Sequence, residues 1–182
     1  MRIISGVRKG RHIEPPKNFN SRISTDLSKE SLFNILFNWY DFEDLSVLDL
    51  FSGTGNISYE FASRGVPDIW SVEQNFGNYQ FIKRTAETLQ FDAIHSVKAN
   101  VMTFLPKLTR QFDIVFADPP FKSNLYYDLY ELLKNADILT DRGIAVIEHD
   151  KHTKFTDFDG LFDQRRYGGV YFSFFKWKNE TP

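Results

Sequence analysis

Cysteine is absent from this chain of 182 residues. Without thiols the chain has no disulfide, no thiolate zinc site and no cysteine nucleophile, and this usage favours a reducing compartment. Long apolar runs are absent as well, since no window approaches the roughly 18 apolar residues that a membrane span needs. The opening segment, MRIISGVRKG, lacks the apolar core of a signal peptide. We therefore expect a cytoplasmic protein without a membrane anchor.

What the chain does contain is typical of a globular protein. Hydrophobic residues make up 42% of it, charged residues 25% and aromatic residues 16%, and phenylalanine alone supplies 19 residues. This apolar content is far above that of disordered chains. A length of 182 residues corresponds to one domain with a small appendage.

The net charge of −2 is unevenly distributed along the sequence. Residues 1–25 carry six basic side chains against the single acid Glu14, a net charge of +5, which leaves −7 for residues 26–182. The six are Arg2, Arg8, Lys9, Arg11, Lys17 and Arg22. We expect a basic N-terminal extension over residues 1–25 and the main domain over residues 26–182. Such an extension can place a polyanion at one edge of an acidic body. A solvated segment with scattered charges is the alternative.

The hydrophobic pattern predicts alternating strands and helices. Buried strands are expected at 46–51, 68–73, 93–99, 113–118 and 143–149, and amphipathic helices at 26–40, 56–64, 76–90, 101–108 and 124–135. This rhythm indicates βαβ units and hence a parallel sheet covered on both faces. Two final strands flank Gly168-Gly169, a hairpin turn signal. The prediction is an α/β fold whose mostly parallel, seven-stranded sheet ends in an antiparallel hairpin.

The first predicted strand leads into a glycine-rich turn, Asp49-Leu50-Phe51-Ser52-Gly53-Thr54-Gly55. Ligands of open parallel sheets bind beyond the carboxyl ends of the strands. Gly53 and Gly55 allow close backbone approach to a ligand at a helix N-terminus. The pyrophosphate motif G-x-G-x-x-G is incomplete because its third position is Ser58, and the carboxylate of Asp49 would repel phosphate. An ammonium group or hydroxyls suit this turn better.

A second acid, Glu73, closes the second predicted strand 20 residues after Gly53. An acid at this place accepts hydrogen bonds from a ribose diol. Together with Asp49 it predicts a nucleoside ligand without phosphates. A tight turn whose acids serve only as caps is the alternative.

Asp118-Pro119-Pro120-Phe121 follows the fourth predicted strand. The two prolines fix the backbone, so that the Asp118 carboxylate and a main-chain carbonyl can face one target. This pair of acceptors suits an amino group, and Phe121 offers a ring on which a base can stack. An ordinary turn at the end of a strand is the alternative.

These motifs resemble those of class I S-adenosylmethionine-dependent methyltransferases that modify exocyclic amino groups. The segments 2–11 (RIISGVRKGR), 24–26 with 29–34 (STD, KESLFN) and 100–105 (NVMTFL) make the chain similar to the RsmD family of 16S rRNA guanine-N2 methyltransferases over essentially its whole length. The resemblance implies a Rossmann-like methyltransferase fold with S-adenosylmethionine as cofactor. The implied partner is 16S rRNA, within the small ribosomal subunit or an assembly intermediate, and the enzyme is expected to be a monomer.

The resemblance also implies roles for individual residues. The implied cofactor-binding residues are Asp49, Phe51, Ser52, Gly53, Thr54, Gly55, Glu73, Gln74, Asn100 and Val101. Asp49 is expected near the cofactor's ammonium, Glu73 at its ribose hydroxyls, and Asn100 with Val101 at its adenine. The implied catalytic residues are Asp118, Pro119, Pro120 and Phe121. The expected RNA contacts are Arg2, Arg8, Lys9, Arg11, Arg22 and Lys122.

The chain departs from the family pattern near the first helix and after the second strand. Leu27 follows Thr25-Asp26 where an arginine is usual, so one basic RNA contact is in doubt, and Asn75 stands where many relatives have aspartate. His149 and His152 have no further ligands nearby in the sequence, and we expect no metal site.

Two other functions compete with this prediction. An enzyme of the same fold can methylate an amino group of DNA or of a protein, and a non-catalytic assembly factor can bind RNA with the same fold. Asp118 and Phe121 argue against a glutamine-modifying enzyme, which usually carries N-P-P-Y. A length of 182 residues leaves little room for a DNA-recognition segment. An intact Asp118 argues against a non-catalytic factor.

Overall fold

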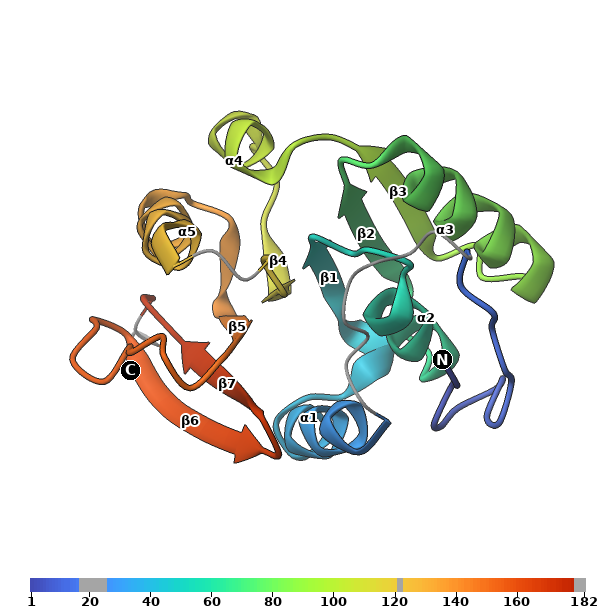
Figure 1. The fold of residues 1–182 in the computed structure, drawn as a ribbon, viewed down its shortest axis with the longest axis horizontal. Coiled ribbons are helices and arrows are strands. Elements are labelled where there is room, and N and C mark those ends of the chain that lie inside the picture. The colour runs from blue at the N-terminus through green and yellow to red at the C-terminus, as the bar shows by residue number, and fades with distance from the viewer. Residues whose placement is uncertain (17–25, 121–122, 179–182) are drawn as a thin grey trace.

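The computed structural model describes residues 1–16, 26–120 and 123–178. At its centre is a seven-stranded sheet with the order β3-β2-β1-β4-β5-β7-β6 (Figure 1). The strands are β1 (Ser46–Leu50), β2 (Asp68–Glu73), β3 (Ile94–Lys98), β4 (Phe112–Ala117), β5 (Leu139–His149), β6 (Leu161–Tyr167) and β7 (Val170–Phe175). β1 to β5 pair in parallel, whereas β7 pairs antiparallel with both β5 and β6. The predicted α/β sheet with a closing hairpin is confirmed.

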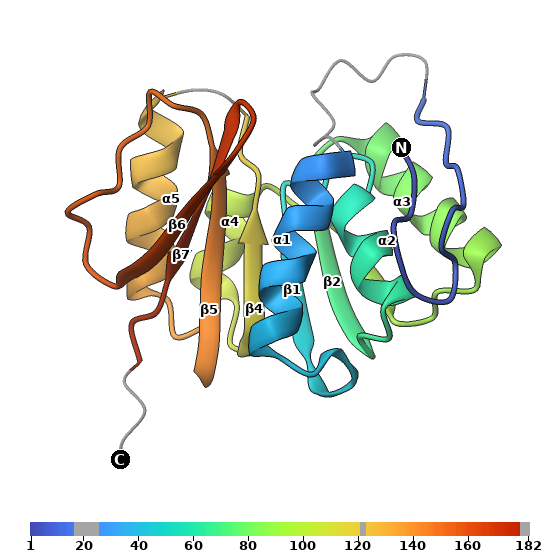
Figure 2. The ribbon, with the colours of Figure 1, turned by 90° about the horizontal axis from the view of Figure 1, so that it is seen from below.

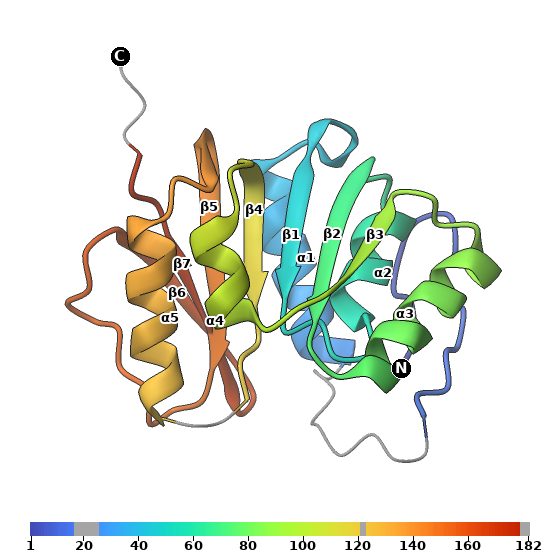
Figure 3. The ribbon, with the colours of Figure 1, turned by 90° about the horizontal axis from the view of Figure 1, so that it is seen from above.

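Helices cover both faces of the sheet (Figures 2 and 3). α1 (Asp26–Trp39), α2 (Asn56–Ser63) and α3 (Phe76–Leu89) pack on one face, and α4 (Val101–Phe104) and α5 (Ser123–Asn135) pack on the other. The short 3₁₀ turns are η1 (Phe42–Asp44) and η2 (Leu105–Lys107). Each face of the sheet packs against the helices in its own apolar cluster, one containing Phe33 and Phe61 and the other Phe112 and Phe155. Every residue of β4 is buried, as expected of a central parallel strand.

Two of the elements with predicted bounds differ from the structure by more than one residue at an end. The helix expected over 101–108 ends at Phe104 and continues as η2, because Pro106 has no amide hydrogen with which to continue the helical ladder. β5 begins before the predicted 143–149, since Leu139 already pairs with Phe112 across an irregularity in the register.

The strand order reverses at β1, which lies between β2 and β4. The chain adds β2 and β3 on one side of β1, and β4 and β5 on the other. In sheets of this kind the ligand crevice opens beyond the carboxyl ends of the strands at the point of reversal. The residues that follow β1, β2 and β4 therefore share the edge at which a ligand is expected.

The N-terminal arm, residues 1–16, folds back on itself and lies along α2 and α3 (Figure 1). Arg2 and His12 form an antiparallel bridge, and the Ile3 amide donates to the Arg11 carbonyl at 3.0 Å. Ile3 and Ile13 are buried in the apolar cluster shared by α1, α2 and α3. The arm is thereby anchored to the body of the protein.

Candidate active site

The glycine turn, residues 51–55, joins β1 to α2 in a strained conformation. Phe51, Gly53 and Gly55 have positive φ angles of 58°, 56° and 82°. A positive φ at phenylalanine is energetically costly, so its surroundings must hold it. The Ser52 amide donates to the Val72 carbonyl of β2 at 3.0 Å, and the Gly55 amide donates to the Ser52 carbonyl at 2.7 Å. Strain of this kind concentrates at ligand-binding turns.

Close packing below the turn leaves no room for a side chain at Gly55. A Cβ atom there would lie 2.7 Å from the ring of Tyr59. Thr54 is buried, and its hydroxyl donates to the Met1 sulfur of the N-terminal arm at 3.5 Å. The turn is thus supported by α2 on one side and by the arm on the other.

Glu73 ties the glycine turn to the end of β2. Its carboxylate accepts hydrogen bonds from the amides of Gly53 at 2.9 Å and Asn75 at 2.6 Å. Burial raises the pKa of this carboxyl group, and the backbone donors oppose the shift. Because each carboxylate oxygen can accept more than one hydrogen bond, Glu73 can receive ribose hydroxyls while it holds the turn.

Asp49 lies beneath the turn, where it is buried. Its carboxylate accepts a hydrogen bond from the Ser58 hydroxyl, and Ser58 also lies 3.0 Å from the Ser71 hydroxyl. Burial raises the pKa of Asp49 to about 7, although the Ser58 hydrogen bond opposes the shift. Ser58 occupies the third position of the incomplete glycine motif, so the residue that breaks the motif is the one that binds the acid. The approach of Asp49 to a cofactor ammonium stays a prediction.

Gln74 and Asn100 follow β2 and β3 and bond to each other at the same edge. The Asn100 amide group donates to the Gln74 side-chain oxygen at 3.0 Å, and the Asn100 oxygen accepts from the Met102 amide at 2.9 Å, which caps α4. Gln74 and Asn100 are exposed, whereas Val101 is buried beside them in the cluster below α4. A polar pair next to an apolar side chain therefore lies where adenine contacts are predicted.

Asp118, Pro119 and Pro120 leave the end of β4, the strand next to β1. The Asp118 amide donates to the Leu50 carbonyl at 3.4 Å, which holds the start of this segment against the start of the glycine turn. Asp118 is partly exposed and Pro119 is buried. The predicted catalytic residue Phe121 and the predicted RNA contact Lys122 lie outside the described residues.

Two of the predicted RNA contacts in the arm are engaged within the protein. Arg2 pairs with Asp26 of α1 at 3.2 Å. Arg8 donates from Nε to the Leu89 carbonyl at 3.0 Å, at the C-terminal end of α3, where a cation is favourable. Both arginines thus hold the arm against helices.

Lys9 and Arg11 are exposed, as Arg2 is, but they differ from Arg2 and Arg8 in their contacts. Across the described ranges 1–16, 26–120 and 123–178, neither side chain takes part in an ion pair. Arg22, the remaining predicted contact of the extension, lies outside these ranges. Lys9 and Arg11 are therefore the arm's cations that are available to a polyanion.

Sequence reasoning missed a buried ionic cluster of Lys29, Glu60 and Arg64. The Glu60 carboxylate lies 3.3 Å from Lys29 Nζ and 2.9 Å from Arg64 Nε, and Lys29 and Glu60 are fully buried. One signal was available in the sequence, because Lys29 recurs with Leu32, Phe33 and Leu36 on the apolar face of its helix. A lysine at such a position indicates a buried partner.

This ionic cluster holds the arm next to the glycine turn. Lys29 donates to the Arg2 carbonyl at 2.6 Å and to the side chain of Asn56, the first residue of α2, at 2.9 Å. The Glu60 carboxylate accepts from the amides of Ile4 at 2.8 Å and Ser5 at 3.0 Å. The arm and the first turn of α2 therefore share one set of buried polar contacts.

His149 is buried at the end of β5 and is held by two hydrogen bonds. Its Nδ1 donates to the Asp150 carbonyl at 2.8 Å, so Nε2 accepts from the Ser173 hydroxyl at 2.7 Å. Burial lowers the pKa of this histidine. No group of three histidine or acidic side chains suited to a metal ion occurs among the residues that the structure describes. No helix among them is long and apolar enough to cross a membrane.

Comparison with known proteins identifies the family. A family model described as Conserved hypothetical protein 95 matches residues 1–176. Ribosomal RNA small subunit methyltransferase D of Escherichia coli (strain K12) is 31% identical over 150 residues, which cover 82% of this chain and 75% of that protein. The chain belongs to the RsmD family. YlbH of Bacillus subtilis is 32% identical to this RsmD-family chain over 158 residues, 85% of each protein.

Solved structures show the same fold as this RsmD-family protein. The Escherichia coli protein yhhF matches it with a TM-score of 0.85 and 27% identity, over 99% of both chains. RsmC of Thermus thermophilus, a 16S rRNA N2 G1207 methyltransferase in complex with AdoMet and guanosine, matches with a TM-score of 0.69 and 18% identity, over 88% of this chain and 45% of that chain. The class I methyltransferase fold that the sequence predicted is confirmed.

Proposed function

We propose that this RsmD-family protein transfers the methyl group of S-adenosylmethionine to the exocyclic N2 amine of a guanine in 16S rRNA. The observation that carries the proposal is the position of Asp118 and Pro119, which leave β4 beside the glycine turn of β1. Support comes from the relatives named small subunit methyltransferase D, which align with 82% of the chain.

The residues at the strand edge fit S-adenosylmethionine, a nucleoside that carries an ammonium and a sulfonium-bound methyl group. Residues 51–55 contain no basic side chain to hold a phosphate, and a strained turn lets the backbone approach a ligand closely. Glu73 accepts the ribose hydroxyls, and Gln74, Asn100 and Val101 contact the adenine. Phe51, Ser52, Gly53, Thr54 and Gly55 line the methionine part of the site.

Asp49 supplies negative charge beneath this site. Its pKa of about 7 means that the carboxyl group changes charge near neutral pH. A bound cation favours the ionised form of a neighbouring carboxyl group. Cofactor binding and ionisation of Asp49 are therefore coupled, with the Ser58 hydrogen bond stabilising the anion.

Asp118 and the Pro119 carbonyl accept hydrogen bonds from the two hydrogens of the guanine amine. These bonds counter the delocalisation of the nitrogen lone pair into the ring and point it at the methyl group. The nitrogen–carbon bond forms as the sulfur–carbon bond breaks, and the proton released from nitrogen passes to solvent. Because the methyl donor is already activated, positioning for in-line attack supplies most of the rate enhancement. Phe121 stacks on the extruded base.

The N-terminal arm brings the RNA to this edge. Within its described part, Lys9 and Arg11 are exposed cations that take part in no ion pair, and Arg22 and Lys122 add predicted phosphate contacts. Arg2 and Arg8 act indirectly, since their partners are Asp26 and the end of α3. Phosphate contacts of this kind position RNA without reading its sequence.

The test is methyl transfer from labelled S-adenosylmethionine to three substrates: small ribosomal subunits without the modification, naked 16S rRNA and duplex DNA. Nucleoside mass spectrometry identifies the product, and calorimetry measures cofactor binding separately. We expect N2-methylguanosine from at least one RNA substrate, and its loss in Asp118→Ala. Transfer to DNA alone would establish the competing DNA enzyme. Cofactor binding without transfer to any of the three would contradict the rRNA substrate, and absence of cofactor binding would favour a non-catalytic assembly factor.

A further inference from the structure

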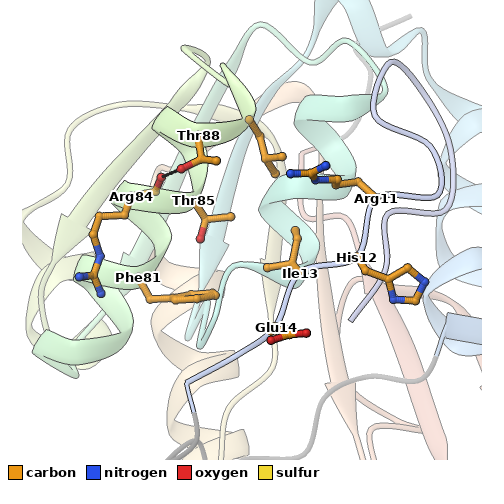
Figure 4. A pocket seen from close by; sticks show the side chains of 9 residues that line it. Arg11, His12, Ile13, Glu14, Phe81, Arg84, Thr85 and Thr88 are labelled. Carbon is orange, nitrogen blue, oxygen red and sulfur yellow. Dashed lines mark hydrogen bonds between the residues drawn. The ribbon is translucent and has the colours of Figure 1, made fainter.

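A groove of about 340 Å³ lies between the N-terminal arm and α3 (Figure 4), and none of the proposed catalytic residues lines it. Ile13 of the arm and Leu89 of α3 line it and are buried, so part of the lining is apolar. Arg11 reaches it from the arm, and Arg84 reaches it from α3. Phe81 contributes a partly exposed ring near the other end of the groove.

The two arginines of this groove are available for a ligand. Both are exposed, and within the part of the chain that the structure describes neither guanidinium forms a hydrogen bond or an ion pair. Arg8, only a few residues from Arg11, is instead bonded to the Leu89 carbonyl and to the Gln90 side chain. Arg11 and Arg84 thus present two unneutralised cations from two different segments to one groove. Their guanidinium groups lie on opposite sides of the groove (Figure 4), so each is suited to a different phosphate of a bound strand.

Charge and shape differ along the groove. Arg11 and Thr88 lie toward one end, whereas Glu14, Phe81 and the guanidinium of Arg84 lie toward the other (Figure 4). A phosphate is attracted to Arg11 and repelled by Glu14, so the two ends favour different parts of one ligand. The Phe81 ring offers a flat apolar surface of the type on which nucleic-acid bases stack.

The groove is connected to the glycine turn by two direct contacts. The Met1 amino group donates to the Ile13 carbonyl at 3.1 Å, and the Met1 sulfur accepts from the Thr54 hydroxyl at 3.5 Å. Ile13 lines the groove and Thr54 belongs to the turn. A strand of RNA that enters the proposed active site therefore has this groove within reach.

We propose that this groove binds an unpaired nucleotide of the RNA substrate that neighbours the target guanine. Arg11 binds its phosphate, its base lies against Phe81, and Arg84 binds the next phosphate of the strand. The inference rests on the proposed function, because that function supplies the RNA, and it adds α3 to the RNA-binding surface. The groove thus contributes to the choice of RNA, whereas the residues at the strand edge perform the chemistry.

Arg11→Ala and Arg84→Ala test the two phosphate contacts, and Phe81→Leu removes the ring but keeps apolar bulk. Lys107→Ala is the matched control, since Lys107 is an exposed cation in η2, which packs on the opposite face of the sheet. The probe is a 16S rRNA transcript, and its affinity is measured by filter binding at several salt concentrations. We expect each arginine variant to weaken binding by roughly 3- to 10-fold and to reduce the slope of log affinity against log salt by about 1. We expect Phe81→Leu to weaken binding by about 5-fold or more with an unchanged salt slope.

The affinity for S-adenosylmethionine, measured by calorimetry, is expected to stay unchanged in all four variants. The inference is overturned if the wild type methylates RNA and the three groove variants bind RNA as tightly as Lys107→Ala does. A wild type that binds RNA through Arg84 but methylates no RNA overturns the proposed function and leaves the groove assignment standing. Arg84→Lys keeps the charge, so partial recovery of affinity in this variant supports a phosphate contact.

Discussion

The Ser58 hydroxyl donates a hydrogen bond to the buried carboxylate of Asp49, directly beneath the glycine turn. A dinucleotide-binding motif would have glycine at position 58, which lets the helix pack closely on the strand. Here the serine has a different role, because its hydroxyl donates a hydrogen bond to a buried acid. Ser58, which interrupts the glycine motif, and Asp49, which precedes it, are therefore directly bonded partners.

Asp49→Asn is expected to change how the free energy of unfolding depends on pH. Burial raises the pKa of Asp49 to about 7, above the roughly 3.9 of an unfolded chain. Between these values the folded state holds a proton that the unfolded state has lost, so this contribution to stability falls as pH rises and levels off above about 7. Glu73 also has a raised pKa and contributes with the same sign.

Urea unfolding of the wild type and Asp49→Asn from about pH 5 to about pH 8 isolates the Asp49 contribution as the difference between the two curves. The wild type should lose stability relative to the variant as pH rises. Asp128→Asn, a change at an exposed aspartate of α5, is the control and should follow the wild type. Parallel curves for the wild type and Asp49→Asn would show that Asp49 has an ordinary pKa.

Glu73→Gln is expected to weaken S-adenosylmethionine binding by roughly 30-fold, about 2 kcal/mol, as is typical for a hydrogen bond to a charged group. The loss of affinity has two sources. The carboxylate accepts hydrogen bonds from the ribose hydroxyls, and it also accepts hydrogen bonds from the Gly53 and Asn75 amides. One amide hydrogen-bond donor of glutamine would face a backbone donor. Calorimetry checks the affinity, with Glu87→Gln, the same change at an exposed glutamate of α3, as the control. Equal losses in both variants would contradict the role of Glu73.

Asp118→Asn is expected to lower the rate of methyl transfer by on the order of 100-fold while cofactor affinity stays unchanged. Asparagine keeps one oxygen acceptor but loses the negative charge that draws the guanine amine toward a tetrahedral geometry. Single-turnover kinetics with bound cofactor measures the chemical step directly. The isosteric control is Asp128→Asn, and a wild-type rate in both variants would remove Asp118 from the reaction.

The succession of strands and helices and the positions of the glycine turn, Glu73 and Asp118 could be predicted because they depend on local patterns. Each follows a short apolar run, and parallel strands bring their carboxyl ends to one edge. The side of β1 to which Asp49 points could not be predicted, because a carboxylate in an otherwise apolar strand is compatible both with a ligand contact and with a buried partner.

The roles of the charged residues in the arm could not be predicted because their partners are distant in sequence. Arg8 is a basic residue of the same short segment as Lys9 and Arg11, yet its side chain donates a hydrogen bond to the end of α3. Lys29 and Glu60 belong to different helices, and only the position of Lys29 on an apolar helix face indicated a buried partner. Charge counting therefore predicted a basic extension but did not separate the cations that bond within the protein, Arg2 and Arg8, from Lys9 and Arg11.

Lys29→Met is expected to destabilise the protein by about 3 kcal/mol, because loss of one partner leaves a buried charge less well compensated. The loss of stability should be at the low end of the range for buried ion pairs, because Glu60 still has other partners. It keeps its ion pair with Arg64 and its hydrogen bonds from the amides of Ile4 and Ser5. Thermal unfolding measures the effect. Lys134→Met, which breaks an exposed pair with Asp159, is the control and should change stability little. Similar shifts in the two variants would contradict a structural role for the buried cluster.

Gly6→Ala and Gly10→Ala form a matched pair that tests how the arm is seated. Both glycines have a φ of +81°, so alanine is strained equally at either position. They differ in their surroundings: a Cβ at Gly6 would lie 1.7 Å from the Ser63 carbonyl oxygen of α2, whereas a Cβ at Gly10 meets nothing within 4 Å. Gly10→Ala should therefore cost only about 1 to 2 kcal/mol of backbone strain, while Gly6→Ala must push the arm off α2.

Hydrogen exchange distinguishes these two effects. In Gly6→Ala the amides of Ile4, Ser5 and Val7, which donate to Glu60 and to the Ser63 carbonyl, should lose protection, and in Gly10→Ala they should keep it. Equal protection in both variants would mean that contact with Ser63 does not hold the arm. Because the arm also lines the groove and contacts Thr54 through Met1, Gly6→Ala should weaken RNA binding more than Gly10→Ala does.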